Sequence, residues 1–440
     1  MKIDRRQVLQ GALAAVGVTA VPGLGRLAFA AEGVDRGLLV IIHLRGGCDG
    51  LNLISPASDP AFIEARNSDL RVSGDGPEAG HALAHGPDPR IDFRLHAAAN
   101  GLAELYKDGH LAFVHAAGLT DATRSHFVAT DMIEHGVAGG AALARSSSGW
   151  LARYQQQIGV AAPGTGISAA GALSGEFLGS SADLAIADLG GGFGVPGGPP
   201  VAAVLDRLYR NAPGDAGAAG RAALGAMAMI DGHIPRDPQN HPIAYAPERG
   251  AAYEPAGDLG RPLRTIAQIA KMEIGLQVAT ADIGGWDTHE NQPGRFRNCV
   301  ERLSAGISAF YADMARFHDR LIVVTVSEFG RRFRSNKSNG TDHGRAGVMA
   351  VLGGRVRGGR IYGRWPGLAS DKLDEGVDLA VANDYRQVLS EALRAHAGRP
   401  LQLAGIFPDY ADPGPLGILD AHGPAARPAL PPVPKAAQRG

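Results

Sequence analysis

Five short apolar runs, separated by segments with helical spacing, constrain the fold of this chain more than any other feature. The runs cover residues 38–44, 111–116, 276–281, 321–326 and 348–352. A continuous apolar run of this length is typical of a strand that is buried on both faces of a parallel sheet. We therefore expect these five segments to be strands of one central sheet.

Apolar residues recur at steps of three and four between the runs. This spacing predicts helices over residues 95–107, 263–272, 296–317 and 385–395. Strands that alternate with helices predict an α/β fold, with a three-layer α/β/α arrangement around a mainly parallel sheet.

The segment from about residue 137 to residue 260 has a different composition, in which Gly, Ala, Ser and Pro dominate. Short helices are expected at residues 201–209 and 218–230. We interpret the segment as an insertion in, or a cap on, a single domain over residues 32–425. The Pro- and Ala-rich residues 426–440 are expected to be disordered.

The first 31 residues predict a twin-arginine signal peptide. Arg5 and Arg6 precede a weakly hydrophobic stretch over residues 9–21, and residues 28–30 (AFA) form a small-x-small cleavage site. A membrane anchor is the alternative, but Pro22 ends the stretch well short of the ~20 apolar residues that a bilayer requires. We expect the twin-arginine machinery to export the protein to the periplasm or another extracytoplasmic location, with no transmembrane anchor after processing.

The charge and the cysteine content argue against nucleic acid as a partner and against a disulfide. The formal net charge is -1 and there is no long basic run, which argues against nucleic acid as a partner. Cys48 and Cys299 are the two cysteines. A chain that folds before export does so in a reducing compartment, so we expect no disulfide between them.

Polar clusters follow the predicted strands, where the working groups of open α/β sheets gather. The clusters are residues 45–52 (RGGCDGLN), 123–127 (TRSHF), 282–291 (DIGGWDTHEN), 327–330 (SEFG) and 339–344 (NGTDHG). Carboxylates and imidazoles at one sheet edge are the ligands that zinc or hard divalent metals require. Clustered carboxylates also repel each other unless a cation lies among them. Together the clusters predict a metal site.

Each cluster alone has a structural alternative. Asp49 can begin a turn with the glycine after it, and Ser125 can cap the helix that follows it. Asp287 and His289 can form a capping pair on a loop. Glu328 can pair with one of the arginines that follow it. These alternatives stay open at the level of single motifs.

The motifs RGGCDGLN, RSHF, GGWDTHEN, SEFGRR and NGTDHG together resemble the alkaline phosphatase and sulfatase superfamily. They most closely resemble an uncharacterised branch whose members are typically exported by twin arginines, and the resemblance covers nearly all of the mature chain. It implies an alkaline phosphatase-like core with a two-metal centre. It implies Ser125 as the nucleophile at a helix start, where an attacked oxyanion is favoured. The metal ligands that it implies are Asp49, Asp287, His289, Glu328, Asp342 and His343.

The sequence departs from the family pattern at the fourth strand. Phosphatases usually have Asp-His there, whereas this chain has Glu328-Phe329, and Asp342-His343 comes later. The sulfatase nucleophile motif, Cys or Ser followed by x-Pro-x-Arg, is absent. One metal position is therefore expected to be altered or lost.

The expected function is an exported, metal-dependent hydrolase of phosphate or sulfate esters on a small molecule or a polymer. Arg124 and Arg45 are candidates for holding the substrate's charged oxygens. Zinc, magnesium and calcium cannot be distinguished from the sequence. The alternative is a non-catalytic extracytoplasmic binding or assembly protein that retains a degenerate metal site.

Overall fold

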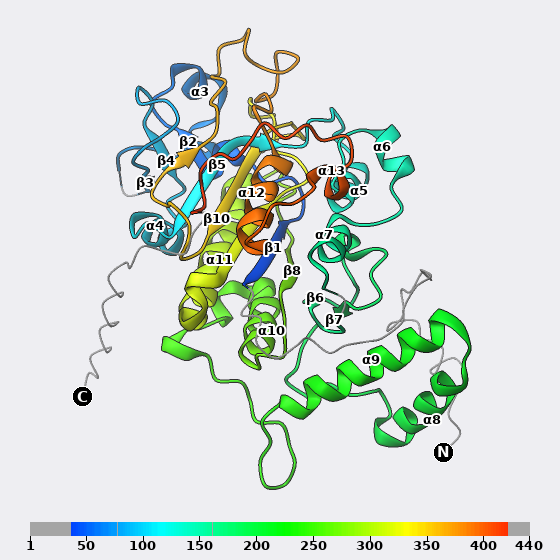
Figure 1. The fold of residues 1–440 in the computed structure, drawn as a ribbon. Coiled ribbons are helices and arrows are strands. Elements are labelled where there is room, and N and C mark those ends of the chain that lie inside the picture. The colour runs from blue at the N-terminus through cyan, green and yellow to red at the C-terminus, as the bar shows by residue number, and fades with distance from the viewer. Residues whose placement is uncertain (1–36, 77, 161, 421–440) are drawn as a thin grey trace, which may run out of the picture.

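The computed structural model describes residues 37–76, 78–160 and 162–420 (Figure 1). The signal peptide expected over residues 1–31 and the tail expected over residues 426–440 lie outside the described residues.

A mixed, mostly parallel sheet forms the centre of the molecule (Figure 1). In the described part of the chain the sheet has nine strands in the order β11-β5-β10-β9-β1-β8-β6-β7, with β12 also paired to β5. β10 runs antiparallel to both β9 and β5, and the other neighbours are parallel. The strands are β1 (Leu38–Leu44), β5 (Leu111–Gly118), β6 (Gly166–Ser168), β7 (Leu184–Ala185), β8 (Val278–Ile283), β9 (Leu321–Val326), β10 (Gly347–Leu352), β11 (Ile361–Tyr362) and β12 (Asn383–Asp384).

Helices cover both faces of this sheet, which confirms the predicted α/β fold. Val40 and Ile42 of β1 pack on one side, in the cluster that holds the apolar faces of α4, α10 and α11. Leu39 and Ile41 point to the other side, in the cluster of α5, α7 and α12. Two-sided burial explains why these strands read as continuous apolar runs. The layers contain α4 (Asn100–Lys107), α10 (Gly260–Lys271), α11 (Gln292–Asp313), α5 (His126–His135), α7 (Trp150–Ile158), α12 (Tyr385–Ala397) and α13 (Leu403–Ile406).

Smaller elements surround the central layers. A three-stranded antiparallel sheet has the order β2-β4-β3 and lies beside α3 (Figure 1). The short elements are α2 (Gly50–Leu53), β2 (Ile54–Pro56), α3 (Pro60–Ala65), β3 (His81–Ala82), β4 (Phe93–Leu95) and α6 (Gly140–Arg145), with 3-10 turns η1 (Ser68–Leu70), η2 (Gly175–Phe177), η3 (Glu248–Gly250), η4 (Glu254–Leu259) and η5 (Ala315–Arg320).

The Gly- and Ala-rich segment contributes to the sheet as well as to its surroundings. β6 pairs with β8 and carries β7 at the sheet edge. The two helices expected here are present as α8 (Gly198–Asn211) and α9 (Gly214–His233), which pack on each other and project from the core (Figure 1).

Two helix predictions had wrong boundaries. The helix expected from residue 95 begins at Asn100, because Leu95 belongs to β4 and pairs with Ile54. The long helix expected to residue 317 ends at Asp313, and the tighter η5 turn follows it. Cys48 and Cys299 are both buried free thiols. In the described residues, no helix combines the length and apolar character that crossing a membrane requires.

A buried ion pair holds the chain where it leaves β1. Asp49 is fully buried, and Arg66 donates to both of its oxygens, over 2.6 and 3.1 Å. Gln292 of α11 also donates to Asp49, over 2.7 Å. Burial by itself raises the pKa of the Asp49 carboxyl, but Arg66 and Gln292 outweigh this effect, so the pKa is lowered. Asp49 is therefore a carboxylate whose charge Arg66 neutralises.

We expect Arg66→Ala to lower the free energy of unfolding by about 3–5 kcal/mol, because it leaves the charge of Asp49 buried and unpaired. The double variant Asp49→Asn/Arg66→Ala buries no charge and should be more stable than Arg66→Ala.

The same ion pair makes stability depend on pH. Since the folded-state pKa of Asp49 lies below the unfolded value of ~3.9, the pair stabilises the fold above about pH 4, and this contribution is lost as the pH falls through the lowered pKa. Urea unfolding at pH 7 and in acid measures both effects, and a double variant less stable than the single one would contradict the explanation.

Candidate metal centre

Four loops meet at one edge of the central sheet. β1, β8 and β9 are parallel, and β5 has the same direction because β10 runs antiparallel to both β5 and β9. Their carboxyl ends therefore lie at one edge. The loops that leave this edge cover residues 45–49, 119–125, 284–291 and 327–346.

The side chain of Arg331 makes hydrogen bonds to three of these four loops. Its side chain is fully buried, and its guanidinium donates to the carbonyls of Gly47 (2.7 Å), Gly46 (2.6 Å), Trp286 (3.0 Å) and Thr341 (2.9 Å). It also donates to Oδ1 of Asp287, over 2.5 Å. Arg331 thus fixes the position of the Asp287 carboxylate relative to the backbone around it.

Two glycines allow these loops to approach each other. Gly46 has φ +121°, and a Cβ atom there would lie 2.5 Å from the backbone nitrogen of Asp287. Gly47 has φ +71°, and a Cβ atom there would lie 2.6 Å from the ring of Phe329. Any other residue at these positions would be strained by its backbone and would push the loops apart.

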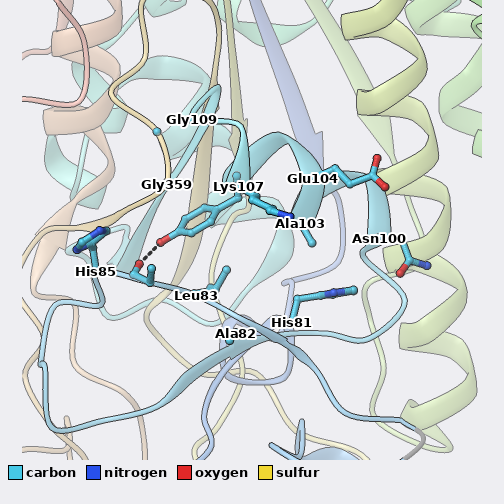
Figure 2. Close-up of a pocket in the computed structure, with 13 residues that line it drawn as sticks. His81, Ala82, Leu83, His85, Asn100, Ala103, Glu104, Lys107, Gly109 and Gly359 are labelled. Carbon is cyan, nitrogen blue, oxygen red and sulfur yellow. Dashed lines mark hydrogen bonds between the residues drawn. The ribbon is translucent and has the colours of Figure 1, made fainter. Parts of the chain in front are cut away.

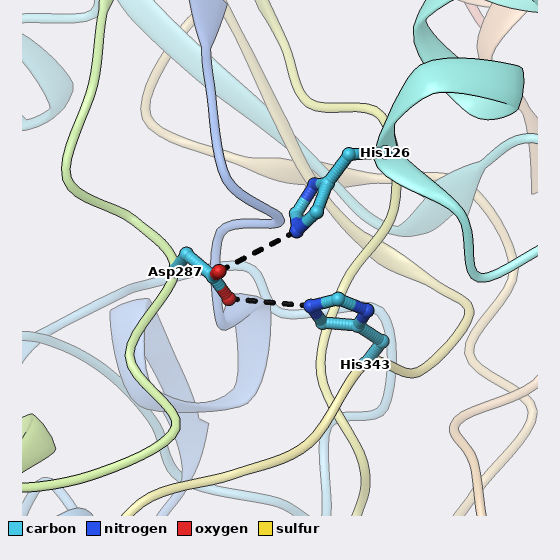
Figure 3. Close-up of side chains that lie close together, drawn as sticks. All are labelled: His126, Asp287 and His343. Carbon is cyan, nitrogen blue, oxygen red and sulfur yellow. Dashed lines mark hydrogen bonds and ion pairs between the residues drawn. The ribbon is translucent and has the colours of Figure 1, made fainter.

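His126 lies on the first turn of α5 and points toward Asp287 (Figure 3). Its Nδ1 is 2.8 Å from Oε1 of Glu328, which also accepts from the backbone nitrogen of Gly46 over 2.8 Å. Because a carboxylate only accepts, Nδ1 carries a proton, and Nε2 faces Asp287 Oδ2 at 3.6 Å.

The other two imidazoles are oriented in the same way. His343 donates from Nδ1 to the carbonyl of Arg124 over 3.0 Å, and its Nε2 is 3.2 Å from Asp287 Oδ1. His289 donates from Nδ1 to Oδ1 of Asp342 over 3.1 Å, and its Nε2 is 3.0 Å from Asp287 Oδ1. Three acceptors from different parts of the chain therefore direct three Nε2 atoms toward one carboxylate.

This arrangement fits a small cation. One ligand atom each from His126, Asp287 and His343 lies within 4.8 Å of the others (Figure 3). The Nε2 atoms of His289 and His343 are 2.9 Å apart, and two lone pairs at this distance repel unless a proton or a cation lies between them. In a tetrahedral site with bonds of 2.0–2.1 Å, neighbouring ligand atoms are about 3.3 Å apart. The described residues thus include a possible His/Asp/His metal site.

The pKa shifts follow from the contacts of each group. The hydrogen bond to Glu328 raises the pKa of His126, whereas burial lowers the pKa of His343. Burial alone would raise the pKa of Asp287, but the hydrogen bond and charge of Arg331 outweigh it and lower the pKa. The Asp287 carboxylate is charged and His343 favours its neutral form, as metal ligands must be, whereas the raised pKa of His126 favours its protonated form, so a metal that binds there has to displace a proton.

Of the six predicted ligands, the structure brings the ligand atoms of three together: Asp287, His289 and His343. Glu328 and Asp342 instead accept from the opposite nitrogens of His126 and His289. Asp49 lies apart and is bound to Arg66. The missed member of the group is His126, which the RSHF motif contains. Its signal was an imidazole at the start of the helix that follows a predicted strand.

The predicted catalytic residues flank this group. Ser125 is exposed at the N-terminus of α5, and its hydroxyl makes no capping hydrogen bond. The guanidinium of Arg124 is paired with Asp378 (2.5 Å) and Glu375 (2.9 Å). Arg45 is the other candidate for holding the substrate's charged oxygens. Its guanidinium is also bound to carboxylates, which belong to Glu134 and Asp282.

A separate cavity of about 650 Å³ lies away from this edge (Figure 2). It is lined by β3 and α4, with His81, Glu104 and Lys107 among its residues. Gly109 of its lining comes just before β5, so the cavity is at the amino end of that strand, whereas the imidazoles gather at the carboxyl ends.

Comparisons with known proteins find limited similarity. Residues 243–405 match a family model described as "Protein of unknown function (DUF1501)". No curated protein matches the chain. Among solved structures, the chain is similar to a protein of the alkaline phosphatase superfamily from Vibrio parahaemolyticus, with 12% identity, a TM-score of 0.29, and coverage of 80% of this chain and 69% of that one.

Proposed function

We propose that this chain is an exported, metal-dependent hydrolase of phosphate or sulfate esters that uses one divalent metal ion. The observation that carries the proposal is the common orientation of His126, His289 and His343, whose Nδ1 atoms are all bound to acceptors while their Nε2 atoms converge on Asp287. Metal-binding histidines are almost always held in this way. The paired arginines at the N-terminus support export.

The donor set is chemically selective. The site offers imidazole nitrogens and one carboxylate, from His126, His343 and Asp287, with His289 beside them. Such a mixed set favours zinc or a similar transition metal over magnesium or calcium, which prefer oxygen ligands. When bound, such an ion would supply the positive charge that polarises an ester oxygen.

We propose a single ion because Asp49, the carboxylate that would be expected to bind a second metal ion, is already paired with an arginine. Asp49 comes from the end of β1, where the resemblance to phosphatases placed a ligand, but both of its oxygens accept from Arg66. The guanidinium supplies the positive charge that a second cation would bring.

Ser125 is the proposed nucleophile. Its hydroxyl is exposed, is not used as a helix cap, and is adjacent in sequence to His126. In the proposed reaction Ser125 Oγ gives its proton to water and bonds to phosphorus or sulfur, while the departing ester oxygen takes a proton from water and leaves as an alcohol. A water molecule then attacks the phosphorus or sulfur, releases the anion and restores the serine hydroxyl. The amide groups at the start of α5 favour the negative charge that gathers there.

A second candidate function is non-catalytic binding on the same fold. It is favoured by the arginines that hold the carboxylates, since Asp287 shares Oδ1 with Arg331 and Asp49 is closed by Arg66. A protein of this kind would bind metal without turning over an ester. Metal binding and turnover therefore have to be measured separately.

We expect His343→Ala to lower zinc affinity at least tenfold, because it removes one of the converging Nε2 atoms. Isothermal titration with zinc and elemental analysis of protein purified without chelator measure the change. His241→Ala is the matched control, since His241 is an exposed histidine that pairs with Asp237. Equal zinc content in the His343→Ala variant and the control would contradict the site.

Glu328 tests the orientation of His126. Glu328→Ala removes the acceptor of Nδ1 and should weaken zinc binding by about 10- to 100-fold. Glu328→Gln keeps an oxygen that can accept this hydrogen bond, and should lose less. If Glu328 were instead a ligand, the glutamine variant would lose as much as the alanine variant.

Ser125→Ala should abolish ester turnover and leave zinc affinity unchanged, because the atoms that converge on Asp287 are imidazole nitrogens of His126, His289 and His343. The zinc-loaded protein and the variant are assayed with a panel of phosphate and sulfate esters. Turnover that survives in the variant would rule out Ser125 as the nucleophile. Absence of turnover in the zinc-loaded wild type would favour the binding function.

A further inference from the structure

The separate cavity lies between the edge of a strand and one face of a helix (Figure 2). Residues 81–85, which begin with β3, form the first wall. The second wall is α4, which contributes Asn100, Ala103, Glu104 and Lys107. These four positions follow steps of three and four and therefore share one face of the helix. The volume of about 650 Å³ is in the range of small-ligand sites.

The strand edge directs backbone groups toward this cavity. β3 is the edge strand of its sheet, and the amide of Leu83 donates to the carbonyl of Phe93 over 3.0 Å. Because antiparallel pairing uses every second residue, the N–H and C=O of Ala82 and the N–H of Ala84 point to the opposite side. This side faces α4, since the hydroxyl of Tyr106 donates to the carbonyl of Ala84. Ala82 and Ala84 both line the cavity.

The strand and the helix run in the same direction. Nε2 of His81 is 3.1 Å from the carbonyl of Ala97, just before α4, whereas Ala84 meets Tyr106 near the end of that helix. Lys107 is therefore at the same end of the cavity as Ala84. Its side chain is exposed and makes no ion pair within the described part of the chain. Backbone donors and an acceptor thus run along the cavity toward a free positive charge.

We propose that this cavity binds a short free peptide, which adds to β3 as a parallel strand with its terminal carboxylate beside Lys107. In parallel pairing, Ala82 donates to the carbonyl of the first peptide residue and accepts from the N–H of the third. The N–H of Ala84 then donates to the terminal carboxylate, which the ammonium group of Lys107 also attracts. A tripeptide is the shortest ligand that makes all of these contacts.

Glu104 favours a ligand whose amino end is also free. It is exposed one helical turn before Lys107, toward the end of the cavity where the peptide begins. It makes no ion pair with another described residue, so its carboxylate is available to attract a free amino group. A tripeptide with two free ends matches both charges. The inference goes beyond the proposed function and does not depend on it, because the cavity is at the amino end of β5 and the imidazoles are at the carboxyl ends.

Isothermal titration of the full chain with trialanine tests this site without zinc. Trialanine should bind, and its C-terminal amide should bind about tenfold more weakly, because the amide lacks the charge that Ala84 and Lys107 hold. Trialanine methylated on the nitrogen of its third residue should lose a similar factor, since it has no N–H for the carbonyl of Ala82. Lys107→Gln should reduce the preference for the acid over the amide. Lys372→Gln, which changes another exposed lysine, is the control and should leave it unchanged.

The comparison of ligands on one unchanged protein keeps the test independent of how a variant folds. Absence of trialanine binding at millimolar concentration would overturn the site. Equal binding of the acid and the amide would overturn the role of the carboxylate, and full binding of the methylated peptide would overturn strand addition. If N-acetyl-trialanine binds as tightly as trialanine, the ligand is not a free peptide.

Discussion

The buried guanidinium of Arg331 is the interaction on which the geometry of the candidate site depends. Removing a cation from water is costly unless its donors are satisfied, and here four backbone carbonyls and the carboxylate of Asp287 satisfy them. Because those acceptors belong to the loops after β1, β8 and β9, one side chain sets the distances between loops that secondary structure does not connect. The position of Asp287 relative to the imidazoles follows from this contact.

The imidazoles depend on a second layer of acceptors. Glu328 comes just after β9, Asp342 precedes His343 in the loop toward β10, and the carbonyl of Arg124 precedes α5. Each acceptor holds a proton on Nδ1 and so directs Nε2 of the same ring toward Asp287. The strand ends place the backbone of these residues, and the hydrogen bonds orient the imidazole rings. This common orientation distinguishes a metal site from a chance cluster of polar side chains on the surface.

The sequence predicted the fold better than the site. Strands at residues 38–44 and 321–326 were located correctly because burial on both faces leaves a continuous apolar run. Leu95 was assigned to a helix because its spacing fits one, whereas pairing with Ile54 places it in a small sheet. For His126 the sequence offers only its position at the start of a helix after a strand, and this position does not tell whether the imidazole points at a carboxylate or at solvent.

The sequence by itself determined which segments become buried strands, and therefore at which sheet edge the charged motifs gather. Hydrophobic patterning acts over a few residues and can be read locally. Only the tertiary structure decided which charges meet: Asp49 pairs with Arg66, 17 residues away, and His126 meets Glu328, 202 residues away. These pairings depend on distances of a few ångströms between loops, because both Coulomb and hydrogen-bond energies fall steeply over that range.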